Sequence, residues 1–200
     1  MAASVYVSAG VAFIVISLLF LIVMIQNSVN ENRIVATPNI PRENGVLTAF
    51  ASAKVKGSAD EVFHIIQNYK GYSDWSPCSQ YKWSDVDENG VPHVGSTGTF
   101  KLSIVDFVER VVPVKLSMLD RENRKIAEMS TTYPKWLLSS ERVQEVLPIE
   151  GQPGFCEYRT YQTLEGIGAY YLLLTARDDL YDSQQRCATE LKAFVEQGKR

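Results

Sequence analysis

An uninterrupted apolar run limits what this chain can fold into. Residues Val5–Ile25 read VYVSAGVAFIVISLLFLIVMI and contain no charge, Asn, Gln or Pro. A helix of this length spans about 30 Å, the thickness of the hydrocarbon core of a bilayer. A cleaved secretory signal is the alternative, but no Lys or Arg precedes the run and no A-x-A site follows it. The sequence therefore predicts one transmembrane helix, with residues 1–27 as an N-terminal anchor.

The residues after the apolar run indicate a linker and an orientation. Residues 28–45 are polar and contain Pro38, Pro41 and Gly45, which is the composition of a linker. Arg33 and Arg42 follow the run, and basic residues tend to stay on the cytosolic side. We therefore expect a single-pass membrane protein, on an endomembrane, with its body in the cytosol.

The remaining residues 46–200 make up one domain and exclude several classes of function. A net charge of −3 and a pI near 5.5 argue against a nucleic-acid partner. His64 and His93 stand apart from the three cysteines, so no metal site is expected. Phosphate-loop, dinucleotide, flavin and haem motifs are missing, and we expect no cofactor.

The pattern of this domain predicts one strand, short helices, six more strands and a long C-terminal helix. Ser58 and Glu61 form a capping box that opens a helix over Ala59–Asn68. Apolar residues at helical spacing predict a long terminal helix over Ala169–Gln197. Pro113 suggests an edge strand or a bulge. The expected strands are Val46–Val55, Tyr81–Val86, Gly98–Val105, Arg110–Leu119, Lys125–Thr131, Leu138–Leu147 and Phe155–Glu165. This order predicts an α+β fold.

Four local sequences carry a resemblance to a known family. They are GSADEVFHIIQNYKGYSDWSP (Gly57–Pro77), RVVPVKLSMLDRENRKIAEMS (Arg110–Ser130), ERVQEVLPIEGQPGFCEYRTYQTLEG (Glu141–Gly166) and the terminal helix. In this order they resemble the SRPBCC superfamily of START-like, helix-grip proteins, and within it the polyketide cyclase/dehydrase branch. The resemblance implies a curved seven-stranded antiparallel sheet wrapped around the long C-terminal helix, over residues 46–200. It also implies a cavity for a lipid-like or polycyclic ligand.

Strand alternation, combined with the resemblance, identifies candidate lining residues. An inward Leu164 places Cys156, Tyr158, Thr160 and Gln162 on the inner face, and Glu157, Arg159, Tyr161, Thr163 and Glu165 on the outer face. The alternative is that Tyr158 and Gln162 bond to neighbours within a packed core. The candidate ligand-binding residues are Tyr72, Trp75, Phe100, Leu102, Thr160, Gln162, Tyr170, Leu173 and Leu180.

Three further residues are candidates for catalysis. Tyr158 and Arg142 can donate hydrogen bonds to a carbonyl or enolate oxygen. Arg142 can equally face outward and pair with Glu141 or Glu145. His93, in a loop, can exchange a proton near neutral pH, although a loop histidine is usually just exposed.

Three functions follow as expectations. The first is a membrane-anchored protein that binds a hydrophobic small molecule such as a lipid, isoprenoid or polyketide. The second is a cofactor-free cyclase or isomerase of natural-product biosynthesis, since shape and a few donors can accelerate cyclisation. The third is a membrane-bound partner of biosynthetic proteins. Whether the protein is an enzyme stays open.

Overall fold

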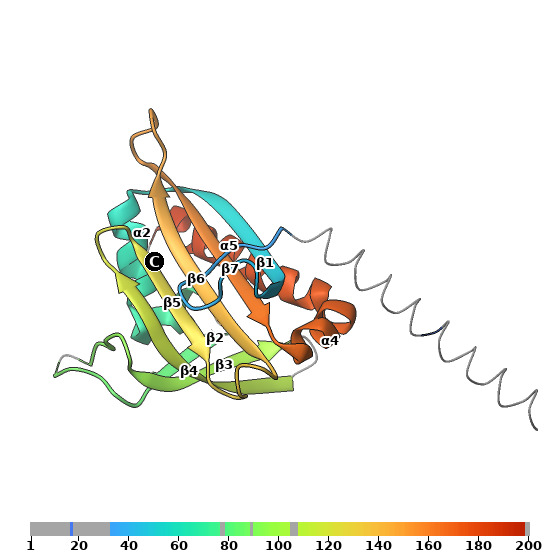
Figure 1. Ribbon diagram of the computed structural model, residues 1–200. Helices are drawn as coiled ribbons and strands as arrows, with labels where there is room; N and C mark the ends of the chain where they lie inside the picture. Colours follow the sequence, from blue (N-terminus) through green and yellow to red (C-terminus); the bar gives the residue numbers. More distant parts are fainter. Residues whose placement is uncertain (1–16, 18–32, 77–78, 89, 105–107, 199–200) are drawn as a thin grey trace, which may run out of the picture. The chain divides into compact units, whose positions relative to one another are not determined.

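A curved antiparallel sheet organises the part of the chain that carries the fold (Figure 1). The computed structural model describes residues 17, 33–76, 79–88, 90–104 and 108–198, and it describes their side chains except at residues 79, 102–104 and 108–110. The chain divides into two units, Met1–Arg33 and Ile34–Arg200, and the second unit is the body. The strands are β1 (Gly45–Lys56), β2 (Ser79–Trp83), β3 (Thr97–Ile104), β4 (Val108–Asp120), β5 (Lys125–Ser130), β6 (Ser139–Pro148) and β7 (Phe155–Glu165).

The strands are joined in the order β1-β7-β6-β5-β4-β3-β2, and each neighbouring pair is antiparallel. The first and last strands pair along their lengths, from Gly45 opposite Glu165 to Lys56 opposite Phe155. The α+β class and the seven-stranded antiparallel sheet expected from the sequence are confirmed.

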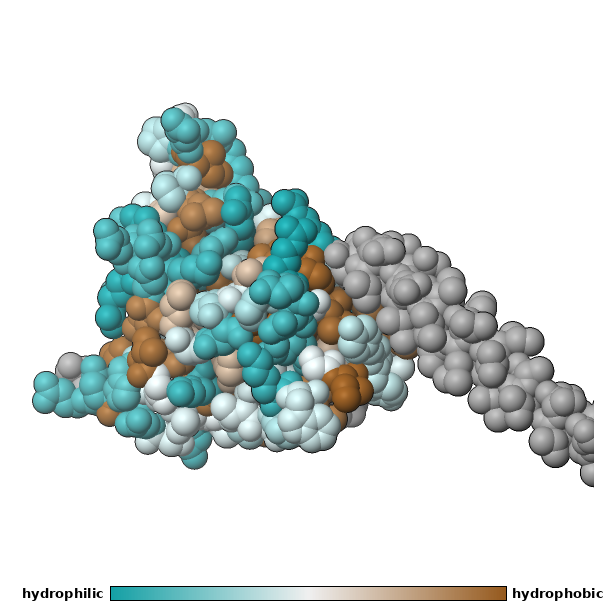
Figure 2. Space-filling model, in the orientation of Figure 1, coloured by the Kyte–Doolittle hydropathy of each residue, from teal (hydrophilic) through white to brown (hydrophobic). Residues whose placement is uncertain are grey.

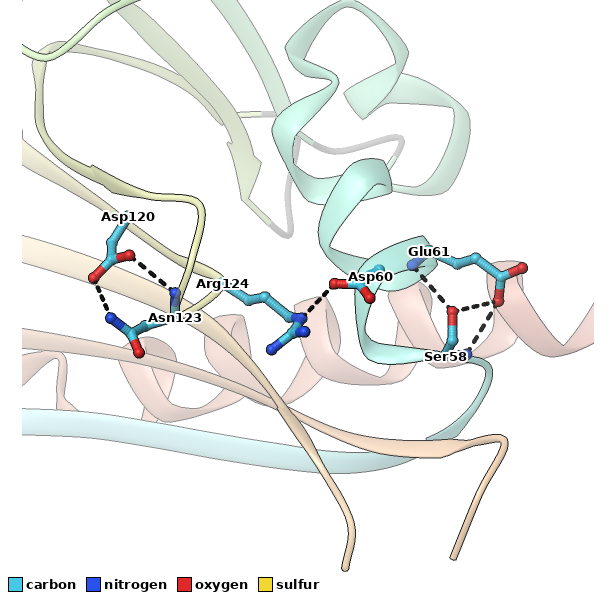
Figure 3. Close-up of polar contacts among 6 residues, drawn as sticks. All are labelled: Ser58, Asp60, Glu61, Asp120, Asn123 and Arg124. Carbon is cyan, nitrogen blue, oxygen red and sulfur yellow. Dashed lines mark hydrogen bonds and ion pairs between the residues drawn. The ribbon is translucent and has the colours of Figure 1, made fainter.

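The short helix after β1 begins where the sequence predicts. In α2 (Ala59–Gln67), the Ser58 side chain accepts from the Glu61 backbone N–H, and the Glu61 carboxylate accepts from the Ser58 N–H (Figure 3). The buried face of α2 packs toward β6. Arg124, in the turn between β4 and β5, donates from Nε to Asp60 Oδ1 at 2.6 Å and so ties the helix to the sheet.

Two short turns and two terminal helices complete the body. The turns are η1 (Tyr69–Gly71) and α3 (Tyr72–Trp75), and the helices are α4 (Ile167–Thr175) and α5 (Arg177–Gln197). The long C-terminal helix is α5, which packs against β1 and β7. Figure 1 shows α2 and α5 behind the sheet.

The expected terminal helix over Ala169–Gln197 is wrong in one respect, because it is broken at Ala176. That residue has φ −139° and ψ 17°, outside the helical region. Neither Gly nor Pro stands at this position, so the sequence gives no signal for the break. The first turn of α4 is held by the preceding loop, where Ile167 N–H donates to Trp136 O and Gly168 N–H to Leu137 O. The break lets α4 follow that loop while α5 follows β1.

The prediction of an edge strand or bulge at Pro113 is wrong. β4 lies between β3 and β5, with Pro113 opposite Thr99, and its irregularity falls between Leu116 and Met118. Pro113 has no N–H to donate to a neighbouring strand, but its carbonyl still accepts from Thr131 N–H at 2.9 Å.

The outer face of the sheet is covered by the segment of residues 34–44, which lies within the range predicted as a linker. Figure 1 shows this segment, in blue, crossing in front of the sheet. Val35 N–H donates to Thr48 Oγ1 at 3.1 Å, and Thr163 Oγ1 donates to Val35 O at 2.7 Å. Tyr161, Thr163 and Glu165 are therefore buried, although they were expected on a solvated face.

The predicted anchor Val5–Ile25 lies outside the described residues apart from Ser17. In the part of the chain that is described, no helix has the length and apolar character needed to cross a bilayer.

Candidate functional site

Polar side chains gather in the space between the inner face of the sheet and the helices. Alternation along the strands points Glu128 of β5, Arg142 and Gln144 of β6, and Tyr158 and Thr160 of β7 to this face. Tyr72 of α3, Tyr81 of β2, and Gln184 and Cys187 of α5 complete the buried polar network. Such groups need internal partners, because burying them without any costs free energy.

Glu128, Tyr81 and Arg142 form the charged part of the buried polar network. Glu128 and Arg142 are direct neighbours on β5 and β6. The Tyr81 hydroxyl donates to Glu128 Oε2 and accepts from Arg142 Nη1 at 3.4 Å. One phenol thus connects a buried acid to a buried base.

Gln144 joins two further phenols. Its Oε1 accepts from Tyr72 OH at 2.9 Å and from Tyr158 OH at 2.7 Å, while its Nε2 has no partner among the described residues. Tyr158 OH also lies 3.5 Å from Cys187 Sγ. This amide is buried and holds an unused donor.

Arg142 continues the network toward α5. Its Nη2 lies 2.8 Å from Cys187 Sγ, and its Nε donates to Thr160 Oγ1 at 3.3 Å. Thr160 Oγ1 in turn donates to Gln184 Oε1 at 2.7 Å, and Gln184 Nε2 donates to Gln162 Oε1 at 3.4 Å. Contacts with Tyr81, Thr160 and Cys187 therefore hold the Arg142 guanidinium in place.

Burial sets the protonation of these groups. It raises the pKa of the Glu128 carboxyl, while the positive charge of Arg142 opposes the rise. Burial likewise raises the pKa of the Tyr72, Tyr81 and Tyr158 phenols well above the usual range. The phenols therefore remain neutral hydrogen-bond donors at physiological pH.

A hollow of about 520 Å³ opens beside this network. The aromatic side chains of its wall are Tyr69, Tyr81 and Trp83; the ring of Tyr69 lies edge-on to Tyr81 at 5.0 Å and to Trp83 at 5.1 Å between centroids. The remaining lining residues are His64, Gln67, Asn68, Lys70, Val86, Gly90, Val91 and Pro92. Tyr81 belongs to both the wall and the network, so the aromatic hollow and the buried charges are linked.

Two indole donors near the aromatic hollow lack partners. The Nε1 atoms of Trp75 and Trp83 are buried and have no hydrogen-bond partner among the described residues. Trp75 packs against Tyr72 with ring centroids 4.2 Å apart. Both Nε1 atoms are buried, so the wall offers the hollow the indole ring of Trp83 rather than its donor.

The structure brings several of the predicted site residues together. Tyr158, Arg142, Thr160 and Tyr72 lie in the buried polar network, and Gln162 joins it through Gln184. Trp75 is next to Tyr72, and Phe100 lies 4.6 Å from the Tyr81 ring.

The other predicted residues lie elsewhere. His93 is exposed in the loop before β3, with Nε2 3.6 Å from Asp85 Oδ1. Leu173 is buried in α4, Tyr170 is exposed there, and Leu180 is half-buried in α5. The side chain of Leu102 lies outside the described residues.

Sequence reasoning missed Glu128, Gln144, Tyr81, Tyr69 and Trp83. Glu128 did leave a signal, because it is a lone charge inside the strand KIAEMS, on the same face as Ile126. For metals, no cluster of three or more His, Cys, Asp or Glu side chains occurs among the residues that the structure describes.

Similarity to known proteins is found by comparing structures, not sequences. No family model matches the chain, and no curated protein matches its sequence. A START superfamily protein from Mycobacterium smegmatis is 16% identical, with a TM-score of 0.55 over 75% of this chain and 97% of that one. The Zhui aromatase/cyclase from Streptomyces sp. R1128 is 10% identical, with a TM-score of 0.57 over 75% and 93%. Norcoclaurine synthase from Thalictrum flavum is 14% identical, with a TM-score of 0.56 over 76% and 94%.

These likenesses confirm the fold that the sequence resemblance predicts. The body has the START-like, helix-grip fold, and aromatase/cyclases are among the proteins that share it. At such low identity the comparisons establish the fold and assign neither ligand nor reaction.

Proposed function

We propose that this protein binds a hydrophobic small molecule in the aromatic hollow and that the segment Val5–Ile25 anchors it to a membrane. The observation that carries the proposal is the hollow itself, whose volume of about 520 Å³ falls in the range of small-molecule sites. Its aromatic wall stands directly beside a buried polar network, which is the combination such sites use.

The wall suggests the chemistry of the ligand. Tyr69, Tyr81 and Trp83 offer ring faces and edges to an apolar or aromatic body. Gln67, Asn68 and Lys70 also line the hollow, and their N–H groups favour a ligand that carries an oxygen acceptor, such as a carbonyl or hydroxyl. A lipid, isoprenoid or polyketide with one oxygen-bearing end has this character.

The anchor has a physical reason in this proposal. An apolar ligand partitions into bilayers, so a site held at the membrane receives it over a short path. The basic residues Arg33 and Arg42 favour a cytosolic body. Residues 26–33 alone separate the apolar run from Ile34, where the body begins.

The test is native mass spectrometry of the full chain in nanodiscs, with identification of retained small molecules. Trp83→Ala removes part of the wall, and Tyr133→Ala is its control because Tyr133 is exposed and outside the hollow. We expect a bound apolar compound in the wild type and in Tyr133→Ala, with occupancy at least tenfold lower in Trp83→Ala. Empty wild-type protein, or equal occupancy in both variants, contradicts the proposal.

A second candidate function is a cofactor-free cyclase or isomerase. The observation that favours it is the buried Glu128 carboxyl, whose pKa is raised, beside a phenol that lines the hollow. Tyr81, which lines the hollow, would pass its hydroxyl proton to a substrate carbonyl oxygen and take a proton from the neutral Glu128 carboxyl, while Arg142, which contacts the Tyr81 oxygen, would stabilise negative charge developing on that phenol.

Two variants separate this candidate from simple binding. Tyr81→Phe and Glu128→Gln should retain the ligand but lower product formation by at least a hundredfold, measured with polyene and polyketide substrates. Full turnover in both variants, or no turnover by the wild type, leaves binding as the function.

A further inference from the structure

The surface formed by α4 and the loop before it exposes large apolar and aromatic side chains. Ile167 is 69% exposed, Tyr171 68% and Trp136 67%, and Tyr170 and Leu174 are each 40% exposed. The backbone bonds from Ile167 and Gly168 to Trp136 and Leu137 hold the loop against the helix, so these side chains form one surface, the α4 face. Figure 2 shows hydrophobic residues at this end of the body.

The α4 face is more than scattered surface hydrophobicity. Single exposed apolar side chains are ordinary, whereas a contiguous group marks an interaction site. Five of the twelve large hydrophobic side chains that are exposed in the described residues belong to it. Its mixture of Trp and Tyr with Ile and Leu is the composition that proteins place at the boundary between headgroups and acyl chains.

The α4 face lies at the same end of the body as Ile34, the residue at which the body begins. Ile34 packs on Gly45 so closely that an added Cβ there would meet Ile34 Cγ2 at 2.5 Å. Gly45 pairs with Glu165, and α4 begins two residues later at Ile167. The residues between the apolar run and Ile34, 26–33, reach at most about 28 Å when fully extended.

We propose that the α4 face rests in the interfacial layer of the same bilayer that holds Val5–Ile25. The inference rests on the proposed anchor, and it gives the body a second contact with the membrane. Lys135, next to Trp136 in the chain, pairs with Glu165 Oε1 at 3.3 Å, yet its side chain is 61% exposed and suits the phosphate level. Asp178 and Asp179 are exposed where α5 begins, so the face fits a zwitterionic rather than a strongly anionic surface.

The experiment uses the full chain in vesicles of phosphatidylcholine with brominated acyl chains, which quench tryptophan within the bilayer. The contribution of Trp136 is the difference in emission between the wild type and Trp136→Phe. We expect the bromines to lower this contribution at least twofold. The double substitution Ile167→Ser/Tyr171→Ser should abolish the quenching, while Val94→Ser/Val111→Ser, at exposed valines elsewhere, should leave it unchanged.

Carbonate extraction of the same vesicles tests the anchor separately. A chain that resists extraction while Trp136 stays unquenched keeps its anchor but overturns the α4 proposal, and a protein partner then becomes the better occupant of the face. A chain that is extracted although Trp136 is quenched in untreated vesicles supports the α4 face and refutes the anchor. Extraction without quenching overturns both. The ligand occupancy of the hollow is measured apart from either result.

Discussion

Glu128 and Arg142 stand directly opposite each other on neighbouring strands, and the Tyr81 hydroxyl connects them. Both charged groups lie on the inner face of the sheet, under the helices. Burying charges is costly unless each is hydrogen-bonded, and removing one partner of such a set costs more than the bond itself gains. Removing the Tyr81 hydroxyl should therefore destabilise the core. It should also affect the aromatic hollow, because the Tyr81 side chain forms part of its wall.

Substituting Tyr81→Phe removes this connection and retains the ring. Hydrogen bonds to charged groups contribute about 1.5–3 kcal/mol, so the free energy of unfolding should fall by about 2 kcal/mol. Urea denaturation followed by circular dichroism measures the change. Tyr133→Phe is the control, since Tyr133 is 52% exposed. A loss below about 0.5 kcal/mol for Tyr81→Phe would show that the network reorganises around the missing hydroxyl.

The raised pKa of Glu128 predicts how stability depends on pH. In the unfolded chain the carboxyl ionises near its ordinary value of 4.5, whereas burial keeps it protonated to higher pH in the native state. The stability that this pKa difference gives the native state is thus fully present below pH 4.5. It is lost as the pH rises through the raised pKa of Glu128 in the folded protein. Glu128→Gln should therefore gain stability relative to the wild type between pH 4 and pH 7. Chemical denaturation at several pH values measures this difference, and a constant difference would contradict the raised pKa.

Local signals made much of the fold predictable. The Ser58–Glu61 capping box fixed the start of α2, and strand alternation placed Tyr158 and Thr160 on the inner face. These features depend on neighbours in sequence, which a pattern records. The break at Ala176 depends instead on the contact between α4 and the loop before it, and no residue at the break signals it.

The candidate site was less predictable for a related reason. Tyr69, Tyr81 and Trp83 come from two separate segments, η1 and β2, and only tertiary packing makes them one wall. The position of Glu128 inside an apolar strand is a signal in the sequence. That Arg142 is its neighbour follows only from the register of β5 with β6. The burial of Thr163 likewise follows from the segment of residues 34–44, whose composition reads as a linker.

The outer face offers a third prediction, at Glu141. This buried carboxylate accepts from Asn39 N–H and Asn39 Nδ2, both at 2.7 Å, and from the Ser117 hydroxyl. Glu141→Gln replaces one carboxylate oxygen with an NH₂ group, which then faces the hydrogen-bond donors of Asn39 and Ser117. The segment of residues 34–44 should then open more often, and amide hydrogen exchange at Asn39 should accelerate at least tenfold.

Glu145→Gln is the matched control for this exchange experiment. Glu145 lies on the same strand but pairs with Lys125 and Arg159, away from the segment. Exchange at Asn39 should be unchanged in that variant. Equal acceleration in both variants would mean that the strand, rather than the Glu141 carboxylate, controls the segment.

Gly166, at the junction between β7 and α4, provides the last prediction. Its φ is +93°, and a Cβ there would meet the backbone of Leu137 and Lys135 at 2.9 Å, so neither conformation nor space admits a side chain. Gly151, in the β6–β7 turn, has φ +72° but open space around it. Gly151→Ala should therefore cost about 1 kcal/mol of unfolding free energy, from conformation alone. Gly166→Ala should cost about 3 kcal/mol or more, because the backbone of the loop must also move. Thermal unfolding of the two variants measures the difference, and similar losses would show that the loop yields freely, which would also weaken its role in holding the α4 face.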